Sequence, residues 1–148
     1  MRHCAIILAA LVFVACSTSA VVSKPTEEEA RAYSAAAVTL SDFSMEIVAH
    51  YQSTRTSVPE DFDAGKFFAV LEDIYRDKAR IRSIKDNYHV SVRPLDGGYS
   101  VMLCDPRTER KIMEDFSCTL TKVDVMSWES DVPVPCVFEN DWKKYCEH

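Results

Sequence analysis

Residues 98–118, GYSVMLCDPRTERKIMEDFSC, decide the fold of this chain. In the first half, Tyr99, Val101 and Leu103 place an apolar side chain at every second position, which is typical of a half-buried strand. Residues 105–108 (Asp-Pro-Arg-Thr) favour a turn, because proline presets φ and aspartate bonds to nearby backbone. The stretch therefore predicts a strand, a turn and a second strand.

The first twenty residues have the pattern of a secretory signal: a short positive start and a central apolar run. The run from Ala5 to Ala15 holds eleven residues, fewer than the roughly twenty needed to span a membrane. Cleavage after Ala20 follows the small-residue rule. It predicts a signal over residues 1–20, a linker over 21–25 and one domain over 26–148.

A second interpretation of the leader remains open. Phe13-Val14-Ala15-Cys16 resembles the lipobox of small exported bacterial lipoproteins, although phenylalanine replaces the usual leucine. The resemblance implies a leader of residues 1–15 and a lipid on Cys16. The Ser/Thr-rich residues after Cys16 suit a flexible tether. The chain is then expected in the periplasm or on the outer membrane, with membrane contact only through the lipid.

The cysteines that remain after export predict a cross-linked domain. An even number of cysteines in an exported chain indicates disulfides, here two, with three possible connectivities. We expect the sequential pairing, Cys104–Cys118 and Cys136–Cys146, which closes loops of moderate size. Four zinc-binding thiolates are disfavoured, because no C-x-x-C pair is present.

Two amphipathic helices are predicted before the strands. Thr26 and Glu29 form a capping box, and apolar residues then recur at helical spacing as far as Tyr51. Ser41-Asp42 compete for backbone hydrogen bonds and leave the continuity of this helix open. A second apolar stripe predicts a helix from Asp63 to about Arg82.

The strand pattern continues on both sides of the opening stretch. Residues 88–93 alternate like a strand, and residues 96–98 (Asp-Gly-Gly) favour a hairpin turn. After Phe116 the apolar positions change parity, which predicts a bulge near Thr121-Lys122 or a strand buried on both faces. The expected class is α+β, with two helices on an antiparallel sheet of about four strands, stapled by two disulfides.

Charge narrows the range of partners. The formal net charge of −6 argues against nucleic acid, and loss of the leader with Arg2 makes the chain more acidic. Five cations crowd the end of the second predicted helix: Arg76, Lys78, Arg80, Arg82 and Lys85. They suit a solvated face near the negative helix end, or a patch for an acidic partner or lipid headgroups.

Motifs for catalysis or cofactors are missing from the sequence. The chain has three glycines, too few for a phosphate-binding loop, and its histidines lack the spacing of metal ligands. We therefore expect no metal, no cofactor and no catalytic residue. His89 falls on the polar side of its strand, where a surface histidine is the simplest interpretation. A small enzyme would require His89 or a carboxylate to point into a pocket.

Phe116-Ser117-Cys118 through Trp128 resembles the last strand region of secreted cystatins, where a cysteine precedes a tryptophan-bearing loop. The resemblance implies a long helix on an antiparallel sheet. Cystatins inhibit papain-like proteases through a Q-x-V-x-G hairpin, and here the only glutamine, Gln52, lies outside any such motif. The resemblance therefore extends to the layout of the fold and not to that activity.

The sequence favours a non-enzymatic envelope lipoprotein that binds another envelope or secreted protein as an assembly module. Trp128, Trp142 and Tyr145 are the expected contacts, because Trp and Tyr anchor interfaces. The same aromatic residues also suit a small core inside the C-terminal loop. The alternative is a secreted inhibitor or toxin-neutralising protein.

Overall fold

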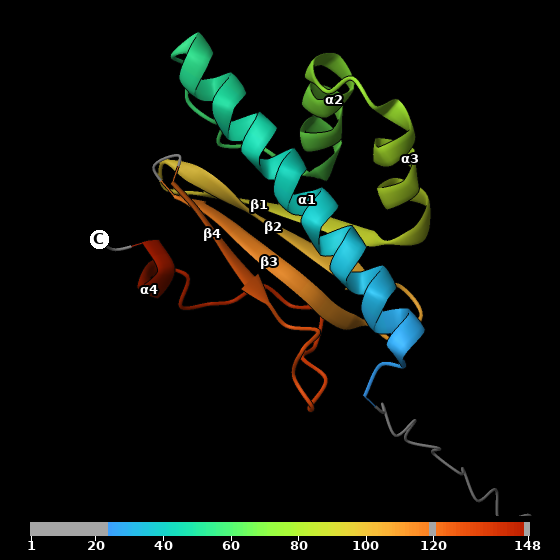
Figure 1. Ribbon diagram of the computed structural model, residues 1–148. Helices are drawn as coiled ribbons and strands as arrows, with labels where there is room; N and C mark the ends of the chain where they lie inside the picture. Colours follow the sequence, from blue (N-terminus) through green and yellow to red (C-terminus); the bar gives the residue numbers. More distant parts are fainter. Residues whose placement is uncertain (1–23, 119–120, 147–148) are drawn as a thin grey trace, which may run out of the picture.

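The computed structural model describes residues 24–118 and 121–146. Its strands form one antiparallel sheet in the order β1-β2-β3-β4 (Figure 1). The α+β class and the four antiparallel strands are confirmed. The elements are α1 (Glu27–Thr54), α2 (Ala64–Ile74), α3 (Lys78–Asn87), β1 (His89–Leu95), β2 (Gly98–Asp105), β3 (Arg110–Cys118), β4 (Thr121–Met126) and α4 (Lys143–Cys146).

Helix α1 begins with the predicted capping box. The Thr26 hydroxyl accepts a hydrogen bond from the Glu29 amide at 3.2 Å, and the Thr26 amide donates to the Glu29 carboxylate at 2.9 Å. Two amides that lack a partner inside the helix are satisfied in this way. The apolar stripe faces the core, with buried side chains that include Tyr33, Leu40, Phe43, Ile47 and Tyr51.

Helix α1 runs unbroken through Ser41 and Asp42, because their side chains bond to other elements. The Ser41 hydroxyl donates to Asp124 of β4 at 3.1 Å. The Asp42 carboxylate accepts from the Arg80 guanidinium of α3 at 2.9 Å. Side chains held this way do not compete with the helix backbone.

The single second helix predicted from Asp63 to Arg82 is wrong, since the segment forms α2 and α3. Tyr75 ends α2 in an extended conformation, with φ −87° and ψ 128°. Asp77 then begins α3, its carboxylate accepting from the amides of Ala79 and Arg80 at 3.1 and 3.2 Å. Asp77 is therefore the N-cap of a new helix, although the apolar spacing by itself predicts that one helix continues through this stretch.

The apolar positions change from even to odd numbers after β3 because the chain reverses into β4. The prediction of a bulge near Thr121-Lys122 is therefore wrong. Cys118 pairs with Thr121 across the β3–β4 hairpin, around residues 119–120, which lie outside the described residues. The register shift in the sheet falls between Leu103 and Cys104, where Ile112 on β3 is the extra residue.

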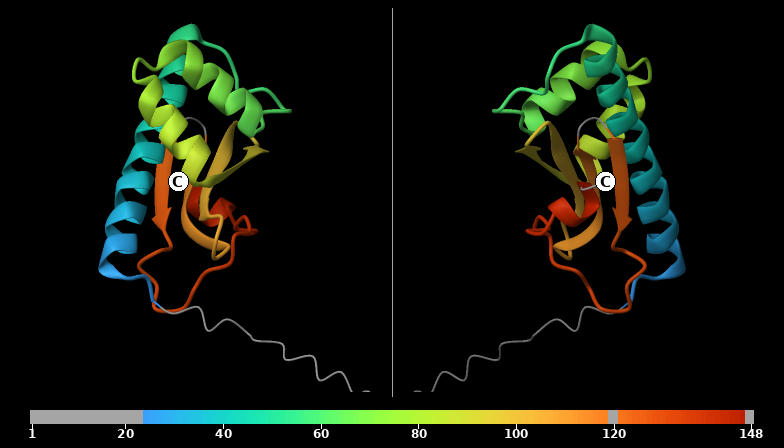
Figure 2. Two further views of the ribbon diagram at one scale, coloured as in Figure 1. Left: turned by 90° about the vertical axis from the view of Figure 1, so that its right-hand side faces the viewer. Right: turned by 90° about the vertical axis from the view of Figure 1, so that its left-hand side faces the viewer.

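The sheet is covered on both faces. Tyr99, Val101 and Leu103 of β2 pack into the hydrophobic core beneath the helices. The Tyr99 hydroxyl lies 2.8 Å from the Ser44 hydroxyl of α1. Every residue of β2 is buried. Figure 2 shows α1 along one side of the sheet and α4 on the other. A central strand in this position has no solvent-facing side, so its polar residues need partners within the protein.

Residues 1–23 lie outside the described residues, and with them the expected signal of 1–20 (or 1–15) and most of the linker of 21–25. In the part that the structure describes, no helix combines the length and hydrophobicity needed to cross a membrane. The N-terminal end of this part lies near the C-terminal segment, because the Lys24 ammonium pairs with Asp131 at 2.7 Å.

The break between α2 and α3 gives a test of the local fold. Asp77→Ala removes the side-chain acceptor for two amides of α3, so we expect a free energy of unfolding lower by about 1 kcal/mol. Asp73→Ala is the matched control, since Asp73 is exposed near the negative end of α2 and its loss leaves stability unchanged or slightly higher. Urea denaturation with the disulfides intact measures both. Equal losses in the two variants would rule out the cap as the cause.

Candidate functional site

The C-terminal segment of residues 127–142, here called the strap, leaves β4, loops past the end of the sheet and returns along the face opposite the helices toward α4 (Figures 1 and 2). The Lys111 amide donates to the Val134 carbonyl at 2.8 Å, and the Cys136 amide donates to the Glu109 carbonyl at 3.0 Å. Farther along, the Arg93 guanidinium donates to the Glu139 carbonyl at 2.8 Å. The strap is therefore bonded to β1, to β3 and to the turn before β3.

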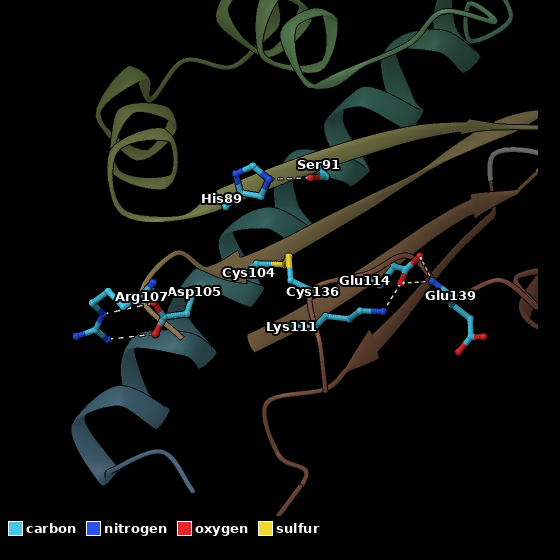
Figure 3. The surroundings of a disulfide bond; sticks show 9 residues. All are labelled: His89, Ser91, Cys104, Asp105, Arg107, Lys111, Glu114, Cys136 and Glu139. Atoms are coloured by element: carbon cyan, nitrogen blue, oxygen red, sulfur yellow. Dashed lines mark hydrogen bonds and ion pairs between the residues drawn. A yellow bond between two sulfur atoms is a disulfide. The ribbon is translucent and has the colours of Figure 1, made fainter. Parts of the chain in front are cut away.

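A disulfide between Cys104 of β2 and Cys136 fastens the strap to the sheet (Figure 3). The two Cα atoms are 5.9 Å apart, within the usual range. The bond closes a loop with a sequence separation of 32 residues and is expected to contribute about 3–4 kcal/mol to stability.

The sequential pairing, Cys104–Cys118 and Cys136–Cys146, is therefore wrong. Cys104 lies opposite Lys111, seven positions before Cys118 along β3. At about 3.3 Å per residue, the two cysteines are about 20 Å apart, too far to bond. The strap instead passes over the end of the sheet where Cys104 lies. Cys146 of α4 is also disulfide-bonded.

A cleft of about 480 Å³ opens beside the disulfide. The prolines of the β2–β3 turn and of the strap form its apolar part, together with the disulfide itself. Ionisable side chains of the sheet edge and the turn form its polar part. The residues that line it are His89, Cys104, Asp105, Pro106, Glu109, Pro135, Cys136 and Val137. The volume falls in the range of sites that accept a small ligand or one side chain of a partner.

A buried carboxylate lies farther along β3, under the strap. The Lys111 ammonium is 2.7 Å from Glu114, with side chains only 7 % and 1 % exposed. The same carboxylate accepts from the Ser100 hydroxyl at 2.8 Å and from the Glu139 amide of the strap at 3.0 Å. The Arg93 guanidinium approaches to 3.9 Å. Such a group tolerates burial only when several donors surround it, and one of these donors belongs to the strap.

A second buried carboxylate, Asp105, lines the cleft. It accepts hydrogen bonds from the Tyr33 hydroxyl of α1 and from the Arg107 amide, the latter at 2.8 Å. Burial alone would raise the pKa of Asp105, but these bonds and the Arg107 guanidinium outweigh it and lower the pKa. Burial and the bond to Asp105 raise the pKa of Tyr33 to about 12. Asp105 therefore ties the β2–β3 turn to α1.

The three aromatic residues predicted as partner contacts do not form one patch. Trp128 packs against the hydrophobic core. The Tyr145 ring stacks on Phe116, with ring centroids 4.8 Å apart. Trp142 is half-buried, with the Lys143 ammonium 5.9 Å from its ring centroid. Cys16, the predicted lipidation site, lies outside the described residues.

The exposed apolar side chains of the strap were missed at the level of sequence. Val132 and Val137 are 73 % and 61 % exposed, more than any other large apolar side chain that the structure describes. The alternation of prolines and valines in residues 132–137 (Val-Pro-Val-Pro-Cys-Val) was the available signal. It indicates extended, stiff backbone. Of the residues predicted as contacts, Trp128 and Trp142 lie near the two ends of the strap and Tyr145 lies beyond it.

His89 lines the cleft and lies 3.1 Å from the Ser91 hydroxyl through Nε2. One condition set for an enzyme, a histidine in a pocket, is therefore met. Over residues 24–118 and 121–146, no group of three or more His, Cys, Asp or Glu side chains is arranged to hold a metal ion.

Comparison with protein-family models, with curated proteins and with solved structures finds no match to this chain. Its function must therefore be inferred from its own residues.

Asp105 gives a pH test of the cleft. Because its pKa is lowered from 3.8 in the folded state, the carboxylate stabilises the fold above that pH. This contribution disappears as the pH falls through the folded-state pKa. We expect Asp105→Asn to cost about 2 kcal/mol near pH 7, and the difference from wild type to shrink below about pH 4. Urea denaturation from pH 2 to 7 measures it, with exposed Asp73→Asn as control. A difference in unfolding free energy between wild type and Asp105→Asn that does not change with pH would contradict a lowered pKa for Asp105.

Proposed function

We propose that this protein is an exported, non-enzymatic module that binds another envelope or secreted protein through the strap. The observation that carries the proposal is the exposure of Val132 and Val137 on a segment fixed by a disulfide. Large apolar side chains held in water cost free energy, and such positions commonly mark interaction sites. The prolines between them restrict the backbone before binding, which lowers the entropy lost on association.

The cleft beside the disulfide supports this proposal. Pro106, Pro135 and Val137 give it apolar walls, and Glu109 adds an acidic edge. The partner segment that fits is an apolar side chain next to a cationic one. The acidic net charge disfavours nucleic acid as a partner. No cofactor enters the proposal, and contact with a membrane is expected only through a lipid on Cys16.

A small enzyme is the second candidate, because His89 lines the cleft. A hydrolase would need an acceptor to orient this histidine and a nucleophile within its reach. Ser91 is within reach, but Asp105 is engaged by Tyr33 and Arg107. The binding module therefore remains the better-supported proposal.

We also propose a second disulfide, Cys118–Cys146. Tyr145 stacks on Phe116, which brings α4 to β3. Cys118 is the last residue of β3, two positions after Phe116. Cys146 follows Tyr145 directly and is disulfide-bonded.

Photo-crosslinking tests the binding surface. A photoreactive phenylalanine analogue at Val137 is expected to give a defined adduct in the exported fraction of the native host, because Val137 faces the partner. The same analogue at Met45, which is 55 % exposed on α1, is the matched control. Excess unmodified protein is expected to suppress the adduct, and a Val132→Asp/Val137→Asp variant is not. Identical adducts at both positions, or competition by the double variant, would refute the proposal.

The mass of the mature protein from its native host tests export and cross-linking. A chain that begins at Cys16 with acyl groups is the expected lipoprotein; one that begins at Val21 favours a freely secreted inhibitor or toxin-neutralising protein. Reduction adds two hydrogens for each disulfide, and we expect two. A non-reducing peptide map is expected to link Cys118 to Cys146, and any other partner for Cys146 would overturn that pairing.

A further inference from the structure

Cys104 lies between two side chains that carry or accept a proton. In the register of the sheet it is directly opposite His89 on β1 and Lys111 on β3. Side chains directly opposite on antiparallel strands have Cβ atoms about 5 Å apart. The three residues share the strap side of the sheet. His89 lines the cleft together with both cysteines, and Lys111 reaches Glu114 under the strap (Figure 3).

The two cysteines of the disulfide differ in how exposed they are to an incoming thiolate. Cys104 lies near the end of the inner strand β2 and is only 1 % exposed. Cys136 is half-buried on the strap, and the cleft opens beside it. An incoming thiolate therefore reaches Cys136 more readily than Cys104. Cys104 becomes the leaving group, and leaving groups that are stabilised as thiolates depart faster.

We propose that Cys104–Cys136 is a thiol-exchange site at which an external dithiol, such as a protein with two neighbouring cysteine thiols, opens the strap. The thiolate of the dithiol attacks Sγ of Cys136 and forms a mixed disulfide. The Cys104–Cys136 bond breaks, and its electron pair goes to Sγ of Cys104. The second thiol of the partner then displaces Cys136. Two thiols are formed in this protein, and the dithiol is oxidised to a disulfide.

His89 is the residue assigned to the leaving group, because it lines the cleft beside both cysteines. A cationic neighbour favours the thiolate over the thiol. Lys111 lies opposite Cys104 on β3, but its ammonium is 2.7 Å from Glu114, which offsets its charge. His89, oriented by the Ser91 hydroxyl at 3.1 Å, supplies the proton that Cys104 takes up. Protonation makes reversal of the exchange slower.

Opening the bond has a structural consequence because charge is buried under the strap. Glu114 loses the Glu139 amide when the strap leaves, and Arg93 loses the Glu139 carbonyl. Water replaces both partners and hydrates side chains whose burial was costly. Reduction therefore loosens the strap and exposes β3. This exchange chemistry is independent of whether Val137 binds a partner.

The order of attack is tested with reduced glutathione, a monothiol that stops at the mixed disulfide. The full mature protein is incubated briefly near pH 7, quenched with acid, alkylated and mapped by mass spectrometry. We expect glutathione on Cys136 and alkylated Cys104, with Cys146 still oxidised. An adduct on Cys104, or reduction of the Cys146 disulfide at the same rate, would show that the bond is structural only.

The role of His89 is tested by the rate of reduction with dithiothreitol. His89→Gln is expected to slow reduction of Cys104–Cys136 at least threefold, while His50→Gln on α1 leaves the rate unchanged. Urea denaturation of the oxidised variants separates this effect from a change in stability. Selective reduction is also expected to speed deuterium exchange at the Lys111 amide, which the Val134 carbonyl protects. Equal rates in both variants, or unchanged exchange, would overturn the proposal.

Discussion

Glu114 is buried in the middle of a strand that is covered on both faces, and the structure depends on how that carboxylate is satisfied. Its partners come from three elements: Ser100 on β2, Lys111 on β3 and the Glu139 amide on the strap. A carboxylate without such donors would cost several kcal/mol in this position. The strap is therefore part of the domain and not a tail added to it. The sheet reaches its native burial only when residues 127–142 lie across it.

Two buried acids on opposite faces of the same sheet hold the elements around the cleft, and one of them, Asp105, lines it. Glu114 fixes the strap on one face, and Asp105 joins the β2–β3 turn to Tyr33 of α1 on the other. The Cys104–Cys136 bond lies between these two anchors in the view of Figure 3. Such a cleft is bounded by covalent and charge-assisted contacts, so it keeps its shape before any partner arrives. This rigidity supports the proposed binding role, because little order has to be gained when a partner binds.

Sequence reasoning succeeds where the determining interactions are local. The Thr26–Glu29 capping box and the alternation in β2 depend on residues within a few positions of one another, and both are present. Sequence reasoning fails where contacts between residues far apart in the chain determine the local structure. Ser41 and Asp42 remain helical because β4 and α3 bind them, and Asp77 stops a helix that apolar spacing would continue. The pairing of Cys104 depends on the path of the strap. Short loops favour the sequential pairing, but the pairing of β2 with β3 carries Cys104 and Cys118 to opposite ends of the hairpin.

The same features explain how one segment can serve both the proposed binding and the proposed opening. Without the disulfide, the hydrogen bonds from Arg93 and to Glu114 would hold the strap, and hydration of the same charged groups after its departure would compete with these bonds. A segment held by an inaccessible disulfide would never leave. In this disulfide Cys104 is buried and Cys136 lies in the open cleft. Once the bond is cut, hydration of the buried charges favours release of the strap. In an oxidising compartment the strap stays closed and displays Val132 and Val137. In the proposed exchange a dithiol cuts the Cys104–Cys136 bond, and hydration of the buried charges then favours release of the strap.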